Sequence, residues 1–238
     1  MQNFVQLWVY LSATPLFGLT ATVSVYVAAQ IAYQRLGQPP WANPVLWSVL
    51  LIGLLLTLTR TPYPSYFSGA QFIHFLLGPA VVALAWPLWA RRAELQARAL
   101  PILCAALAGG AVASLGGLAI GWALGLPRDV LASLAAKSVT APVAMGIAQQ
   151  LGGIPALAAV FALLTGLSGA IGAKYWFDLL RVRPPEVRGF ALGTTSHGIG
   201  AARAMQVHPD AGAYAGLALG AQVVLASVLM PLVAKLFF

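Results

Sequence analysis

Long apolar stretches alternate with short polar or basic interruptions along the chain. Dividing the sequence at its charges and at its Pro and Gly clusters predicts eight apolar segments, at residues 12–34, 44–59, 69–90, 100–125, 129–148, 155–179, 188–206 and 211–236. A helix that spans a membrane needs about 20 apolar residues. The pattern therefore predicts an all-α integral membrane protein, with six to eight hydrophobic segments in a single polytopic domain over residues 1–238.

A β-barrel, the other spanning architecture, does not fit this pattern. Its strands need strict alternation of apolar and polar residues over about ten positions. Residues 156–164 read ALAAVFALL, which does not alternate.

Composition and charge exclude two further classes of protein. Charged residues make up 8% of the chain and hydrophobic ones 60%, whereas soluble domains carry about 25% charged residues. These values exclude a soluble enzyme and a disordered chain. The net charge is +8, but most cations lie in short loops or at segment edges. That placement is typical of topology signals and does not indicate a nucleic-acid partner.

Two basic loops, 91–98 and 181–188, indicate that one segment between them does not cross the membrane. The positive-inside rule places both loops in the cytoplasm, yet three apolar segments separate them. Either one basic loop is external or one segment turns back. The best candidate for turning back is 129–148, because its centre holds Lys137 and Pro142, and proline interrupts a helix. We expect a re-entrant hairpin there, buried in protein or lining a water cavity.

The segment 188–206 has a similar interruption. Its centre, Gly193–Gly200, contains three hydroxyl residues, His197 and three glycines, and each Gly costs a helix about 1 kcal/mol relative to Ala. This second break would enter from the opposite face to the first. Two discontinuous or re-entrant helices of this kind are typical of secondary transporters with inverted repeats.

The charges near the segment centres favour an anion as ligand. Lys137 and Arg203 are the most central cations, whereas all five acidic residues lie in loops or at segment ends. A cation inside a membrane is a functional candidate by default, although Lys137 could also snorkel to the surface. Broken helix ends add anion-binding N–H groups. His197 titrates near neutrality and could carry a proton or donate to a carboxylate; the alternative is a neutral histidine bonded to a carbonyl.

An enzymatic function is not expected. Ser196 and His197 are adjacent, but a hydrolytic triad needs a third, orienting group, and no acid lies in a segment centre. The chain also has no zinc-ligand pair and no phosphate-binding loop motif. We therefore expect no catalytic residue, no cofactor and no metal.

Several motifs resemble the LrgB/CidB family. They are residues 137–144 (KSVTAPVA), 152–155 (GGIP) and 188–203 (RGFALGTTSHGIGAAR), with further matches at Asn43-Pro44, 66–69 (YFSG) and 79–88 (PAVVALAWPL). Members are bacterial inner-membrane proteins described as holin-like or antiholin-like, encoded beside a small LrgA/CidA-type membrane protein. The plant member is a plastid-envelope glycolate/glycerate transporter, and some bacterial pairs are linked to pyruvate uptake.

The resemblance and the residues together predict a secondary carrier for small monocarboxylates of the glycolate, glycerate, lactate or pyruvate class. The alternative is a holin-like or antiholin-like regulator of murein hydrolase activity and lysis. The expected partners are the lipid bilayer of the bacterial inner membrane, an LrgA/CidA-type protein and further copies of the chain. The candidate substrate-binding residues are Asn43, Lys137, Ser138, Thr140, Pro142, Thr195, Ser196, His197, Gly198 and Arg203.

Overall fold

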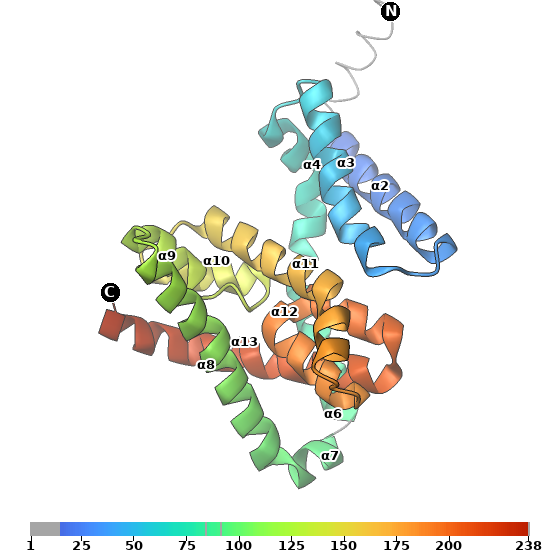
Figure 1. Cartoon of the computed structure of the whole chain (residues 1–238). Coiled ribbons are helices and arrows are strands. Elements are labelled where there is room, and N and C mark those ends of the chain that lie inside the picture. The colour runs from blue at the N-terminus through green and yellow to red at the C-terminus, as the bar shows by residue number, and fades with distance from the viewer. Residues whose placement is uncertain (1–14, 84, 91, 238) are drawn as a thin grey trace, which may run out of the picture. The chain divides into compact units, whose positions relative to one another are not determined.

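The computed structural model describes residues 15–83, 85–90 and 92–237, and every regular element in those residues is a helix (Figure 1). The first three positions of the predicted segment 12–34 lie outside the described residues. The chain divides into two compact units, 1–83 and 84–238, which are described separately. That all 238 residues form one membrane domain stays a prediction.

In the first unit, α2 (Pro15–Arg35) packs closely against α4 (Tyr63–Phe75). A Cβ at Gly18 of α2 would clash with the backbone of Tyr66 in α4, so only glycine permits this approach. The Thr22 and Tyr66 hydroxyls are 2.7 Å apart and share a hydrogen bond. The helices of this unit are α2 (Pro15–Arg35), η1 (Pro40–Ala42), α3 (Pro44–Leu58), α4 (Tyr63–Phe75) and α5 (Leu77–Ala83).

The second unit contains both predicted breaks. Its longest helices mostly begin at a proline, which suits the first turn because proline lacks only an N–H that would be unpaired there. Gly125 and Gly152 have φ values of +70° and +75°, which turn the chain after α8 and α10. The helices are α6 (Ala85–Ala90), α7 (Arg92–Ala97), α8 (Ala99–Ala123), α9 (Arg128–Leu134), α10 (Ala141–Gln150), α11 (Pro155–Leu179), α12 (Pro185–Val207) and α13 (Pro209–Phe237).

Among the described residues, four helices are long and apolar enough to cross a membrane: Leu16–Arg35, Ala99–Ala123, Pro155–Leu179 and Pro209–Leu232. Their exposed faces carry large apolar side chains such as Val112, Leu164 and Val224, as lipid contact requires. The chain is therefore a multi-pass, all-helical membrane protein.

The other predicted segments differ in form from a single long helix. Pro44–Leu58 is apolar but shorter than a span. The segment 69–90 is divided among α4, α5 and α6. The segments 129–148 and 188–206 are interrupted, as described below. The predicted number of six to eight hydrophobic segments therefore stays a prediction.

Small residues bring α12 and α13 together. A Cβ at Gly189 would overlap the backbone of Ala211, and one at Gly193 would overlap the backbone of Ala215. Because both pairs are separated by the same number of residues, the first half of α12 runs parallel to α13. Such small-residue contacts let backbones approach closely inside membranes.

Candidate functional site

The first break lies between α9 and α10, where the sequence predicted it. Helix α9 ends at Leu134, turns occupy the following residues, and α10 begins at Ala141. Pro142 lies in the first turn of α10 and so favours the restart of the helix. The Ser133 hydroxyl accepts a 2.7 Å hydrogen bond from the Ile154 N–H. This bond joins the residues before the break to those after α10, so the chain folds back between them.

Lys137 is held at the centre of this break. Its ammonium donates a 3.2 Å hydrogen bond to the hydroxyl of Ser138, which is buried. Its aliphatic stem lies against Gly117 of α8, where an added Cβ would be 2.7 Å from the lysine Cε. The absence of a side chain at Gly117 therefore gives Lys137 its position.

The second break is at His197, inside α12. This residue has φ 39° and ψ −135°, which is not helical and is unusual for a residue with a side chain. The ring nitrogen Nε2 lies 2.7 Å from the carbonyl oxygen of Ala162 in α11. Because a carbonyl oxygen can only accept a hydrogen bond, Nε2 of His197 must carry the hydrogen. A neutral histidine bonded to a carbonyl is therefore compatible with this geometry.

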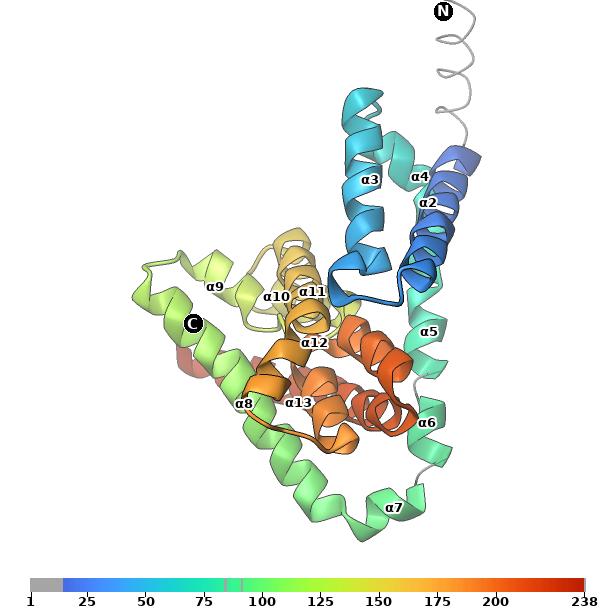
Figure 2. The ribbon, with the colours of Figure 1, turned by 45° about the vertical axis from the view of Figure 1, so that its right-hand side comes forward.

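His197 divides α12 into two halves, and the halves fold back on each other (Figure 2). A straight helix of 23 residues would be about 35 Å long. Instead, one pocket is lined both by Arg188, near the start of α12, and by Val207, at the end of α12. Near the break, a Cβ at Gly200 would lie 2.8 Å from the Leu192 carbonyl oxygen. The chain thus reverses its direction at His197.

Both breaks contact the same two long helices. On α8, Gly109 faces Thr194 of the second break, and Gly117 faces Lys137 of the first. The two glycines are eight residues apart, which is about 12 Å along a helix. On α11, Ala162 accepts the His197 contact and packs in one core cluster with Val139 of the first break. Helix α11 lies between the α9–α10 segment and α12 (Figures 1 and 2).

Each break contains a buried hydroxyl without a hydrogen-bond partner among the described residues. These are Oγ1 of Thr140 and Oγ1 of Thr194. Thr194 is 2% exposed. Buried polar groups are nearly always paired, so each such exception needs an explanation. Each hydroxyl can donate to an acceptor that reaches its own break.

The other candidate residues have different surroundings. Ser196 is buried, with its hydroxyl 3.3 Å from that of Thr195. Thr195 is exposed and donates to the Ala191 carbonyl, as hydroxyls in membrane helices often do. Gly198 has no atom near an added Cβ. Their substrate-binding roles stay predictions.

Asn43 and Arg203 have contacts of other kinds, and their substrate-binding roles stay predictions. Asn43 belongs to the first unit, where its side-chain oxygen caps α3 by accepting from the N–H groups of Val45 and Leu46 at 2.9 and 3.3 Å. Arg203 lies on the returning half of α12 and lines a separate pocket with Arg183.

Sequence reasoning missed the α8 contribution. Two pairs of adjacent glycines in α8 were the available signal, because a glycine inside an apolar helix often marks a point where another chain segment packs close to the backbone. It also missed Gln222 of α13, which is 5% exposed and donates a 2.6 Å hydrogen bond to the Ala106 carbonyl of α8.

The loops that precede α8 and α12 lie at one end of the second unit. Arg98, before α8, and Glu186, at the start of α12, line one pocket. The Arg98 guanidinium also donates a 3.4 Å hydrogen bond to the Tyr214 hydroxyl of α13. That both basic loops face the cytoplasm stays a prediction.

Comparison with known proteins identifies the family. The LrgB-like family model matches residues 22–236. The protein YxaC of Bacillus subtilis (strain 168) is 37% identical over 216 residues, which cover 91% of this chain and 94% of that protein. The holin-like protein CidB of Staphylococcus aureus (strain Mu50) is 29% identical over 217 residues, with the same coverage. No solved structure matches. The chain therefore belongs to the LrgB-like family.

Proposed function

We propose that the protein is a secondary carrier for small monocarboxylates in the bacterial inner membrane. The observation that carries this proposal is the pair of interrupted segments against α8 and α11, each with a buried, unpartnered threonine hydroxyl, Thr140 or Thr194. Interrupted helices that meet inside a helical unit form the binding sites of many carriers.

The charge distribution supports an anionic substrate. Lys137 supplies a cation within the first break, and the acidic residues of the chain lie outside both breaks. A carboxylate could pair with Lys137 and accept from the Thr140 hydroxyl and from backbone N–H groups at the start of α10. A substrate of two or three carbons suits a site assembled from such short side chains.

The proposed topology has both interrupted segments re-entering the membrane from opposite faces, in an inverted-repeat arrangement. Three observations support it: the bond between Ser133 and Ile154, the reversal at His197 and the common position of the loops before α8 and α12. Single cysteines in loops 91–98 and 181–188, in a chain whose own Cys104 is replaced by alanine, should react only from the cytoplasmic side of intact cells. Labelling of either loop from outside would refute this topology.

The carrier function is tested by counterflow in proteoliposomes. We expect the purified protein to exchange labelled glycolate, lactate or pyruvate for an unlabelled carboxylate. Lys137→Gln should weaken substrate affinity roughly 10–150-fold, because a lost charge-assisted hydrogen bond costs about 1.5–3 kcal/mol. Arg128→Gln is the matched control, since it removes an exposed cation at the start of α9. Equal affinity in the two variants would show that Lys137 does not bind substrate.

A holin-like function is the second candidate, because CidB of Staphylococcus aureus is named a holin-like protein. In this case the protein would act as an oligomer with an LrgA/CidA-type partner. A pore should release neutral solutes of carboxylate size from the same liposomes, with or without the partner. A carrier should exchange carboxylates and retain the neutral solutes, so a single experiment separates the candidates.

A further inference from the structure

A pocket of about 330 Å³ lies at the end of the second unit where α12 begins and ends, and we call it the basic pocket. Its charged lining comes from three helices and a loop. Lys174 is in α11, Arg183 in the loop before α12, and Arg188 and Arg203 in the two halves of α12. The rest of the lining includes the Phe177 ring and several alanines. The fold thus brings four permanent cations around one cavity.

The carboxylates nearby do not neutralise this charge. Asp178 is paired with Arg188, with 2.6 Å between Nη2 and Oδ1. Asp210 lies 3.8 Å from the imidazole of His208, which also lines the pocket. Even with Glu186, which adjoins Pro185 of the lining, counted beside these two carboxylates, the four cations leave one positive charge. A sphere of this volume is about 9 Å across, close to the Debye length of about 8 Å at physiological salt, so the charges act on the same ligand.

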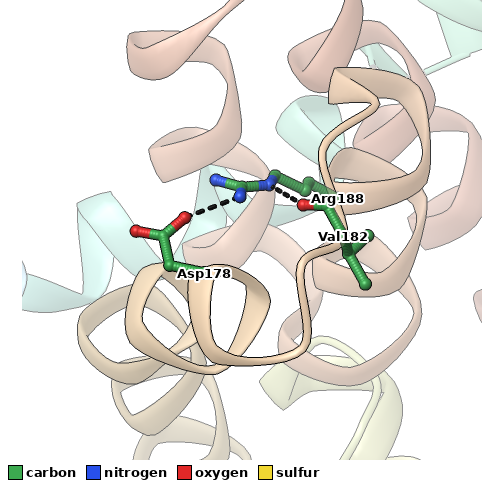
Figure 3. Close-up of polar contacts among 3 residues, drawn as sticks. All are labelled: Asp178, Val182 and Arg188. Atoms are coloured by element: carbon green, nitrogen blue, oxygen red, sulfur yellow. Dashed lines mark hydrogen bonds and ion pairs between the residues drawn. The ribbon is translucent and has the colours of Figure 1, made fainter.

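Arg188 lines the basic pocket and is held by contacts to Asp178 and Val182 (Figure 3). Besides its ion pair with Asp178, its Nε donates a 2.5 Å hydrogen bond to the Val182 carbonyl. Its guanidinium also lies 5.6 Å from the centre of the Phe177 ring. These contacts fix the loop between α11 and α12, which carries Arg183. A preformed loop loses less freedom when a ligand binds.

Topology signals alone do not explain this arrangement. The positive-inside rule requires cations in loops, but Lys174 and Arg203 lie within helices. Arg181, in the same loop as Arg183, is exposed and does not line the pocket. The lining of the pocket therefore includes Arg183 but not Arg181, although both lie in the same loop.

The depth of the basic pocket indicates the source of its ligand. Lys174 and Phe177 are in the last turns of α11, at the end of a candidate span. Tyr175 and Trp176, beside them, are 59% and 62% exposed, and exposed aromatic residues at span ends lie at the level of lipid headgroups. Arginine forks match the paired oxygens of phosphate, and basic pockets between membrane helices bind anionic headgroups.

We propose that the basic pocket binds a phosphate-bearing anion, with the headgroup of an anionic phospholipid as the source that its depth favours. This site is separate from the breaks and does not depend on the carrier proposal. The test uses the full-length protein in neutral detergent. Native mass spectrometry measures the binding of phosphatidylglycerol and of phosphatidylcholine, and thermal unfolding measures the effect of inorganic phosphate against chloride at equal ionic strength.

We expect phosphatidylglycerol to bind more tightly than phosphatidylcholine. Arg183→Gln should weaken phosphatidylglycerol binding about five-fold, which corresponds to about 1 kcal/mol for an interfacial cation. Lys174→Gln should do the same and replaces Arg183→Gln if that variant does not fold. Arg181→Gln, which removes an equal charge from the same loop, should bind like the parent.

Stabilisation by inorganic phosphate that is lost in Arg183→Gln would support the proposal with a soluble anion as the ligand. Equal binding of the two lipids together with equal effects of phosphate and chloride would overturn it. Equal losses in Arg181→Gln and Arg183→Gln would also overturn it, because they would show a general charge effect and no defined pocket.

Discussion

Gly117→Ala tests the position of the Lys137 charge without removing the charge. The added Cβ would lie 2.7 Å from the lysine Cε, whereas carbon atoms in contact are normally about 3.5–4.0 Å apart. The lysine stem must therefore move by about 1 Å. Because the stem is flexible and half-buried, the fold can accommodate this shift.

The displacement should lower substrate affinity about 10-fold. The Lys137 ammonium donates to Ser138 at 3.2 Å, so a shift of about 1 Å removes it from hydrogen-bond range. The same shift would break a hydrogen bond from the ammonium to a bound carboxylate. A lost hydrogen bond to a charged group costs about 1.5–3 kcal/mol, and the lower value corresponds to roughly 10-fold in affinity. The measurement is competition against a labelled carboxylate in proteoliposomes at fixed pH.

Gly116→Ala is the matched control on the same helix. An added Cβ at Gly116 meets no atom within 4 Å. Both substitutions should stabilise α8 slightly, because alanine favours a helix over glycine by about 0.5–1 kcal/mol. Thermal unfolding in detergent checks that the two variants are equally stable. If their substrate affinities agree within about two-fold, the position of the Lys137 ammonium does not determine binding and the reasoning is refuted.

Four further substitutions, one of them a control, test the second break and the first unit. His197→Ala removes the ring contact to α11 and should abolish transport without loss of membrane insertion; normal uptake would make His197 a packing residue. Gly193→Ala should destabilise the protein by about 1–3 kcal/mol or more, because the new Cβ overlaps the backbone of Ala215, whereas Gly198→Ala should not, since its Cβ meets nothing within 4 Å. Asn43→Ala should cost about 1 kcal/mol of stability through loss of the α3 cap, measured by thermal unfolding.

The sequence by itself determined the class of protein and the places where its helices fail. Long apolar runs indicate a membrane protein, and four of the eight predicted segments correspond to helices long and apolar enough to span a membrane. Pro142 and the glycine-rich stretch around His197 mark the breaks, because proline and glycine act on the local backbone. Such local effects can be inferred without knowing which helices are neighbours.

The tertiary structure alone decided which residues meet. Nothing near Lys137 in the sequence indicates Gly117, and nothing near Thr194 indicates Gly109, because these contacts join helices far apart in the chain. The motif around Asn43 suggested a binding role, but only the structure shows that its side-chain oxygen caps α3. Arg203 appears to belong with His197, but the reversal of α12 carries it to the basic pocket. The physical reason is that apolar patterning fixes the length of a helix, whereas side-chain volume at helix crossings fixes its partners.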